Sequence, residues 1–472
     1  MLPINRIPEI LKRMDLNTSQ AEAMKTCFGI LAIMSREDNN KILIARDGME
    51  IMLNAMTVHV DRTDVQEAGC DLLWSLAFNS NAVKEIIAKF NGAVILVRAL
   101  KRHSRSSDFL KSACGALSNI CQFRLNQEAV ASQGGLQPLV GSIHIHQTNA
   151  KLLPFIFDAI ASIIVNNEEN AKGVSSLGII PIIVTSLNRH KAIRKVVKSG
   201  CHTLAILSDV KGQASKIAFA GGVPIILALL DTHPLYIDLH RVAAVVLLRM
   251  LQESTHVGRE ICSYEGIRIL LYSLEQGGAQ QDTVAAVTHI LYTVTNPNSS
   301  MIATTAHLIE HQLWRNTTSS DSGTNGNNGG TNGTNGTRDI ASTALSGIIQ
   351  VLHQYVNRRD VIRASCRLIT NLSHYAQVIL ALDQKYTVDY LLECVYMHQD
   401  AKDVIEACIN FIKHIYKYQI LHIVAIATHI TTNNTTNITN NNSSIGRIGT
   451  NSNANTPKHQ SQPSQPCTTT TN

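Results

Sequence analysis

The chain has 472 residues, of which 44% are hydrophobic and only 5% aromatic, and its formal net charge is +6. This composition supports a core of aliphatic side chains and argues against a dedicated nucleic-acid binder, which normally shows dense Lys/Arg clusters and stacking aromatic residues. The chain shows no leader-like segment, and its longest apolar stretches, such as 420–430, are shorter than the roughly 20 residues of a membrane span. We therefore expect a protein of the cytoplasm, or alternatively also of the nucleus, without membrane insertion.

A glycine recurs at nearly equal intervals through much of the chain. It stands at Gly48, Gly92, Gly135, Gly178, Gly222 and Gly266, with spacings of 44, 43, 43, 44 and 44 residues. A period of about 40–47 residues is typical of HEAT and armadillo repeats, whereas TPR units have about 34. The spacing therefore predicts a helical solenoid, in which each unit buries its apolar face against its neighbours.

A second position repeats in phase with the glycine, and we call it the marker. In nine units it is Cys27, Cys70, Cys114, Phe157, Cys201, Ala244, Val287, Cys366 and Cys408. The residue three positions later is apolar in every unit, from Ile30 to Phe411. Such spacing indicates the buried stripe of a helix, so we predict a long helix around each marker. Cysteine at such a position acts as a small hydrophobic residue rather than a disulfide partner or metal ligand.

Each unit is predicted to begin after its glycine, with a short apolar helix such as 221–230 and a polar turn such as 231–236. The marker helix follows, and a short segment such as 126–135 leads to the next glycine. Because glycine tolerates a left-handed backbone, we expect it to end a helix and turn the chain there.

Two polar segments interrupt or follow the repeats. Residues 316–337 are rich in Asn, Thr and Gly, and residues 431–472 are rich in Asn, Thr, Ser and Gln. Such compositions bury too little apolar surface to offset the entropy of ordering, so we expect both segments to be disordered. The predicted organisation is repeats one to seven in 1–315, the insertion, repeats eight and nine in 338–430, and the tail. Both segments are expected to be passive, with a regulated lid or a phosphorylation target as the alternative.

The strings KSACGALSNI (111–120) and SGCHTLAILS (199–208) resemble the third helix of the armadillo repeat family. The resemblance covers residues of about 5–310 and 338–420. It implies an all-α, right-handed solenoid of about nine armadillo-type repeats, whose third helices line a concave groove. Periodicity alone leaves HEAT repeats open, and the recurrent glycine favours armadillo repeats.

The resemblance also suggests which residues face the groove. The positions three before, one after and five after the marker share one helix face. The nuclear-import adaptors of this family carry Trp at the second of these positions and Asn at the third. Here the second position never holds Trp, the third holds Asn only at Asn119 and Asn371, and no Arg-rich N-terminal segment is present. The chain therefore does not resemble the import-adaptor subgroup.

Charge on this face changes along the chain. Early units present Glu67, Asp71 and Asp158, and later units present basic residues. We hypothesise that repeats five to eight bind an acidic peptide segment; a solvated helix face without a ligand is the alternative. The candidate groove residues are Asn119, Lys198, His202, Arg241, Arg249, Arg363, Arg367 and Asn371.

No motif for catalysis or cofactor binding is visible, including phosphate-binding loops, nucleophile elbows and zinc-protease signatures. His144 and His146 lie close in sequence but lack further metal ligands nearby. We therefore expect no enzyme activity, cofactor or metal. The predicted function is a scaffold or adaptor that binds other proteins. A regulator of a small GTPase, a nucleic-acid-associated basic solenoid and a microtubule- or membrane-associated assembly factor are the alternatives, and the oligomeric state stays open.

Overall fold

The computed structural model describes residues 6–254, 256–263, 266–276, 281–295, 359–372, 384–398, 401–413 and 416. Regular secondary structure in these residues is entirely helical, which confirms the predicted all-α class. The helices belong to the unit formed by residues 1–414. The predicted insertion 316–337 and tail 431–472 lie outside the described residues, and so does the boundary predicted between repeats seven and eight.

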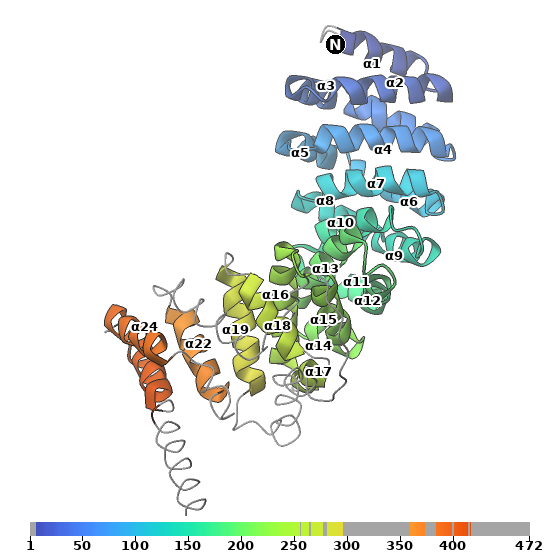
Figure 1. The fold of residues 1–472 in the computed structure, drawn as a ribbon. Coiled ribbons are helices and arrows are strands. Elements are labelled where there is room, and N and C mark those ends of the chain that lie inside the picture. The colour runs from blue at the N-terminus through green and yellow to red at the C-terminus, as the bar shows by residue number, and fades with distance from the viewer. Residues whose placement is uncertain are drawn as a thin grey trace, which may run out of the picture. The chain divides into compact units, whose positions relative to one another are not determined.

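The predicted marker positions all lie on helices. These helices are α2 (Ala21–Met34), α4 (Thr63–Ala77), α7 (Ser107–Ile120), α10 (Leu153–Ile164), α13 (Arg194–Ser208), α16 (Ile237–Glu253), α19 (Gln281–Thr295), α22 (Arg359–Leu372) and a helix at 402–413. From α2 to α22 each packs against the next marker helix (Figure 1). The markers are buried except for the half-buried Cys27, and the described cysteines are free thiols. The predicted core role of the cysteines is thus confirmed at the buried positions.

Two shorter helices separate successive marker helices through much of the chain. The first of each pair is α5 (Asn81–Lys89), α8 (Arg124–Ser132), α11 (Glu168–Ser176), α14 (Gln213–Phe219) or α17 (His256–Ser263). The second is α6 (Gly92–His103), α9 (Leu136–Ile145), α12 (Ile179–Arg189), α15 (Gly222–Thr232) or α18 (Gly266–Gln276). The segment at 126–135 therefore contains most of a helix, and a unit has three helices.

The remaining described helices depart from this three-helix pattern. They are α1 (Ile7–Leu16), α3 (Asp38–Val58) and α24 (Gln384–Met397). The second unit has a single continuous helix, α3, where later units have two, and α1 precedes the first marker helix directly.

The recurrent glycine serves close packing more than a left-handed turn. Gly178 does have a positive φ, of 79°, as predicted. In the next unit, however, the left-handed residue is Gly221, with φ 81°, and the recurrent Gly222 follows it as the first residue of α15. A Cβ atom on Gly222 would lie 2.6 Å from the carbonyl oxygen of Ile217, so this position needs glycine because α14 and α15 approach closely. Gly48 lies within the continuous α3 and makes no turn.

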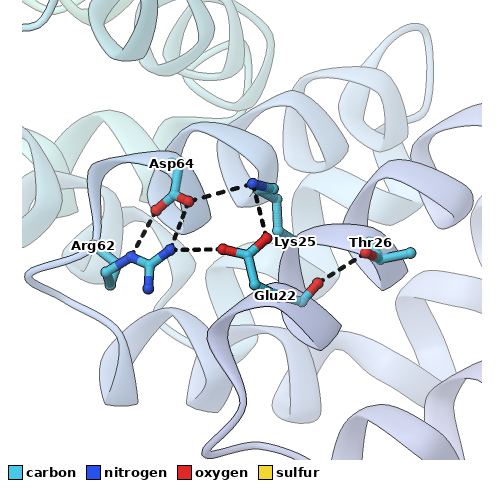
Figure 2. Close-up of polar contacts among 5 residues, drawn as sticks. All are labelled: Glu22, Lys25, Thr26, Arg62 and Asp64. Carbon is cyan, nitrogen blue, oxygen red and sulfur yellow. Dashed lines mark hydrogen bonds and ion pairs between the residues drawn. The ribbon is translucent and has the colours of Figure 1, made fainter.

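An exposed ion-pair network joins the first two marker helices (Figure 2). Arg62, at the start of α4, pairs with Glu22 of α2 at 2.9 Å and with Asp64 at 2.8 Å. Lys25 of α2 pairs with Glu22 at 3.0 Å and with Asp64 at 3.5 Å. The Arg62 guanidinium holds the pKa of the Asp64 carboxyl well below its usual range. The network therefore links α2 to α4 through charges that salt will screen.

Candidate functional site

The predicted groove face is accessible in some marker helices and covered in others. At the position directly after the marker, Asp71 of α4, Asp158 of α10 and His202 of α13 are exposed. At the same position of α2, Phe28 is fully buried. Accessibility on this face therefore differs from helix to helix, and two hollows along its first five marker helices form a candidate binding surface.

The first hollow lies over α2 and α4, and we call it the Trp74 hollow. Its volume is about 630 Å³, and its lining combines Ile33, Trp74 and Phe78 with polar and charged side chains such as Asp71. Ile33 is 60% exposed and Phe78 is 53% exposed. Lys41 also lines the hollow, and its Nζ donates a hydrogen bond to the Phe78 carbonyl oxygen at 3.0 Å. This hollow therefore offers some exposed apolar surface among polar groups.

The second hollow lies over α7, α10 and α13, and we call it the Phe155 hollow. Its volume is about 940 Å³, and its lining combines Phe155 with charged side chains. Those charged side chains are Asp108, Lys111, Lys151, Asp158, Lys195 and Lys198. Four positive charges thus face two negative ones around an aromatic ring.

Trp74 and Phe155 connect the two hollows across α7. Their ring centroids are 5.8 Å apart with an interplanar angle of 84°, which is the edge-to-face geometry that aromatic pairs favour. The contact passes over Gly115 of α7, where a Cβ atom would lie 2.6 Å from Cε2 of Trp74. The missing side chain at Gly115 therefore lets residues of α4 and α10 meet above α7. Neither aromatic residue occupies a position that the sequence assigned to the groove.

Carboxylates of α4, α7 and α10 crowd this part of the face. Desolvation raises the pKa of Glu67, and the nearby charges of Asp108 and Asp71 raise it further. Desolvation also raises the pKa of Asp158, although a hydrogen bond from Ser199 opposes the shift. A ligand that brought further negative charge to these carboxylates would meet repulsion.

The two asparagines predicted to face the groove bond to the neighbouring helix instead of pointing freely at a ligand. Asn119 is buried, and its Nδ2 donates to the Trp74 carbonyl oxygen at 2.9 Å. Asn371 is buried, and its Nδ2 donates to the Tyr292 carbonyl oxygen at 3.3 Å. Both amides therefore tie a marker helix to the preceding one along the chain.

Some basic side chains of the predicted groove bond to other residues of the chain, and others are exposed. Arg249 donates through Nη1 to the Ala205 carbonyl oxygen and to Ser208 Oγ, both at 3.0 Å, and it also pairs with Asp209. Arg363 pairs with Asp403 at 2.7 Å.

Arg367 is exposed and lies 5.9 Å from the ring centroid of Tyr292. Lys198, His202 and Arg241 are also exposed. Lys198 is the member of the predicted set that lines the Phe155 hollow. The basic part of the face is therefore best tested at α13 and at Arg241 of α16.

Within the described ranges, no three His, Cys, Asp or Glu side chains are grouped so that they would hold a metal ion. No single described helix combines the length and apolar character needed to cross a membrane.

Comparison with known proteins points to one repeat family. Residues 101–293 match the family model described as the GAC ARM domain. The chain is 23% identical over 223 residues to Armadillo repeat-containing protein 6 of Homo sapiens, and 24% identical over 223 residues to the protein of the same name from Pongo abelii. Each match covers 43% of this chain and 44% of the relative, so the chain spans less than half the length of these curated relatives.

The fold also matches solved structures. The crystal structure of an engineered protein is similar with a TM-score of 0.59 at 17% sequence identity, covering 87% of this chain and 99% of that chain. At this identity the likeness concerns the fold alone.

Proposed function

Because the chain is an armadillo-repeat protein, we propose that it is a non-enzymatic scaffold or adaptor whose marker helices hold an extended or helical segment of another protein. Stacked repeats offer a long surface on which successive side chains of a partner find successive helices. The proposed binding surface, which we call the groove, is the face that carries the Trp74 hollow and the Phe155 hollow. Its proposed partner is a segment of another protein. The proposed location of the complex is the cytoplasm.

The aromatic pair above Gly115 carries this proposal. Trp74 and Phe155 are both half-buried, so part of each ring is available to a ligand. Aromatic side chains dominate the energetics of protein interfaces, because they bury large apolar areas and carry a defined geometry. Two hollows joined by such a pair suit two separated side chains of one extended segment.

The carboxylates of the same face favour a protein partner over nucleic acid. Glu67, Asp71 and Asp108 lie close enough for Asp71 and Asp108 to raise the pKa of Glu67. A phosphate backbone would have to pass these charges, whereas a peptide can present apolar or basic side chains to them. Regulation of a small GTPase remains the alternative, and partner capture that depends on the nucleotide state would favour it.

Site-specific photo-crosslinking tests the proposal. A photoreactive amino acid replaces Phe155 in the groove or Phe219 of α14, which is 79% exposed and outside the marker helices. We expect a specific protein to be captured from position 155 in cells and not from position 219, and the capture to weaken when Trp74 is changed to Ala. The proposal fails if position 155 captures nothing specific, or if the same partners are captured only from position 219.

A further inference from the structure

We infer that the Phe155 hollow binds an acidic, extended peptide segment that carries one apolar side chain, and that Lys111, Lys195 and Lys198 recognise its carboxylates. This inference rests on the proposed function and adds the chemistry of the partner. It concerns α7, α10 and α13, the marker helices of repeats three to five, and so overlaps the sequence prediction of repeats five to eight only at α13.

Part of the lining of the hollow is apolar. Phe155 and Ile193 line it, and Ile193 is 40% exposed. Leu152 and Pro154 also line the hollow, and both are largely buried. A volume of about 940 Å³ lies within the range of pockets that hold small ligands. An apolar side chain placed there would lose water contact against an aromatic ring.

The lysines around this wall carry positive charge that nearby carboxylates offset only in part. Against the larger effect of desolvation, Lys111 lowers the pKa of Glu67 and Lys198 lowers the pKa of Asp158. Lys111, Lys195 and Lys198 are exposed, and none of them forms an ion pair with a described carboxylate. Lys111 lies with Nζ 6.0 Å from the ring centroid of Phe155, so a cation borders the apolar wall directly. By contrast, Arg249 and Arg363 already pair within the chain. Exposed lysines that form no ion pair within the described residues, set beside an apolar hollow, are complementary to an acidic ligand with an apolar anchor.

The acidic residues of the hollow favour a peptide over a nucleic acid as its ligand. Asp108 and Asp158 line the same hollow as the lysines. A nucleic acid carries negative charge at every step of its backbone and would place some of it against these carboxylates. A peptide can set its apolar side chain beside Asp158 and its own carboxylates beside the lysines. Desolvation already raises the pKa of Asp158, so further negative charge there is disfavoured.

Fluorescence anisotropy with synthetic peptides tests the inference on the full chain. The probe is a labelled peptide of about twelve residues, rich in Asp and Glu, with one central Leu. The comparison probes replace that Leu with Ser, replace the acidic residues with Lys, or are a single-stranded RNA of similar length. We expect the acidic Leu peptide to bind best and the Leu-to-Ser change to weaken binding about tenfold, in keeping with the loss of one buried apolar side chain.

Charge-reversal variants test the lysines. Lys195→Glu with Lys198→Glu should weaken binding of the acidic peptide by at least about tenfold. Lys211→Glu with Lys216→Glu is the matched control, because both lysines are exposed, lie outside the hollow and give the same change in net charge. Equal losses in the two double variants would overturn the inference, and so would tighter binding of the RNA or of the basic peptide.

The inference and the proposed function fail separately. If no acidic peptide binds but a partner is still captured at position 155, the groove binds a segment of different chemistry and only the inference is overturned. If the acidic peptide binds the wild type and the lysine double variant alone loses it, the inference is supported.

Discussion

The Nε2 atom of His103 donates a hydrogen bond to the carbonyl oxygen of Val60, 2.7 Å away in the loop of the preceding unit. The same bond recurs, at 2.7 to 2.8 Å, from His59 to Thr18, His190 to Gln147 and His233 to Lys191. Each histidine lies at the end of the helix before a marker helix, and we call the set the histidine ladder. His146 occupies the equivalent position, but its buried Nε2 finds no partner among the described residues. The ladder links consecutive repeats through their loops.

The ladder predicts a stability cost for losing one histidine. His103→Ala removes the donor to Val60 and the edge contact of the imidazole with Phe109, whose ring centroid is 5.4 Å away. We expect the free energy of unfolding to fall by about 1–3 kcal/mol, because the hydrogen bond to Val60 and the packing against Phe109 are both lost. Urea unfolding followed by circular dichroism measures the change. His144→Ala, at an exposed histidine of α9, is the control, and equal midpoints for the two variants would contradict the prediction.

Gly115 predicts opposite effects for two glycine substitutions. Gly115→Ala places a methyl group against the Trp74 ring, and displacing that ring should lower the free energy of unfolding by about 1–3 kcal/mol. Gly29→Ala has no atom within 4 Å of its new methyl group, so helix propensity should raise that free energy by about 0.5–1 kcal/mol. Chemical unfolding compares the variants, and Trp74 near-ultraviolet circular dichroism reports ring displacement. If Gly115→Ala raises the free energy of unfolding as much as Gly29→Ala does, the Trp74 ring does not lie close to Gly115 and the prediction is wrong.

The network around Arg62 predicts a pH-dependent contribution from Asp64. Because the folded pKa of Asp64 is lowered, its contribution to stability is present above its unfolded pKa of about 4 and is lost as the pH falls toward the folded value. Asp64→Asn should therefore lower the thermal midpoint at neutral pH, and the difference from wild type should shrink in acid. Added salt should also reduce it. The control is Asp15→Asn, at an exposed residue of α1 with no ion pair among the described residues; a difference unchanged by acid would refute the prediction.

The repeat and its core were predictable because burial follows spacing. The markers recur with the period of the units, so Cys114 and Phe157 were placed in the core by arithmetic alone, and both are fully buried. The reason for the recurrent glycine was not predictable in the same way. Its period is visible in the sequence, but the close approach of Ile217 to Gly222 depends on how two helices cross. The histidine ladder is periodic too, yet its bonds depend on where loop carbonyls point.

The binding face was harder to predict, because helix position does not decide what a side chain contacts. Asn119 lies on the predicted face, but its side-chain amide donates a hydrogen bond to the Trp74 carbonyl oxygen. Trp74 and Phe155 lie outside the predicted positions and meet only because Gly115 lacks a side chain. The absence of a side chain at Gly115 was the visible signal that large neighbours would cross α7 there.

Arg241 and Arg249 predict different outcomes for the same charge reversal. Arg249→Glu removes bonds to the Ala205 carbonyl oxygen and Ser208 Oγ, and it sets a carboxylate near Asp209. We expect it to lower the free energy of unfolding by about 1–3 kcal/mol, whereas Arg241→Glu, at an exposed side chain, should change it by less than about 0.5 kcal/mol.

Urea unfolding of the two single variants decides the point. Equal stability of the two variants would mean that the contacts of Arg249 contribute little to folding. Charge reversal at either residue could then be used to test partner binding. If Arg249→Glu is destabilised as expected, a loss of partner binding in that variant mixes folding with recognition. Charge reversal of the basic part of the groove should then use Arg241 with Lys198, because both side chains are exposed and their replacement changes charge without removing a described ion pair.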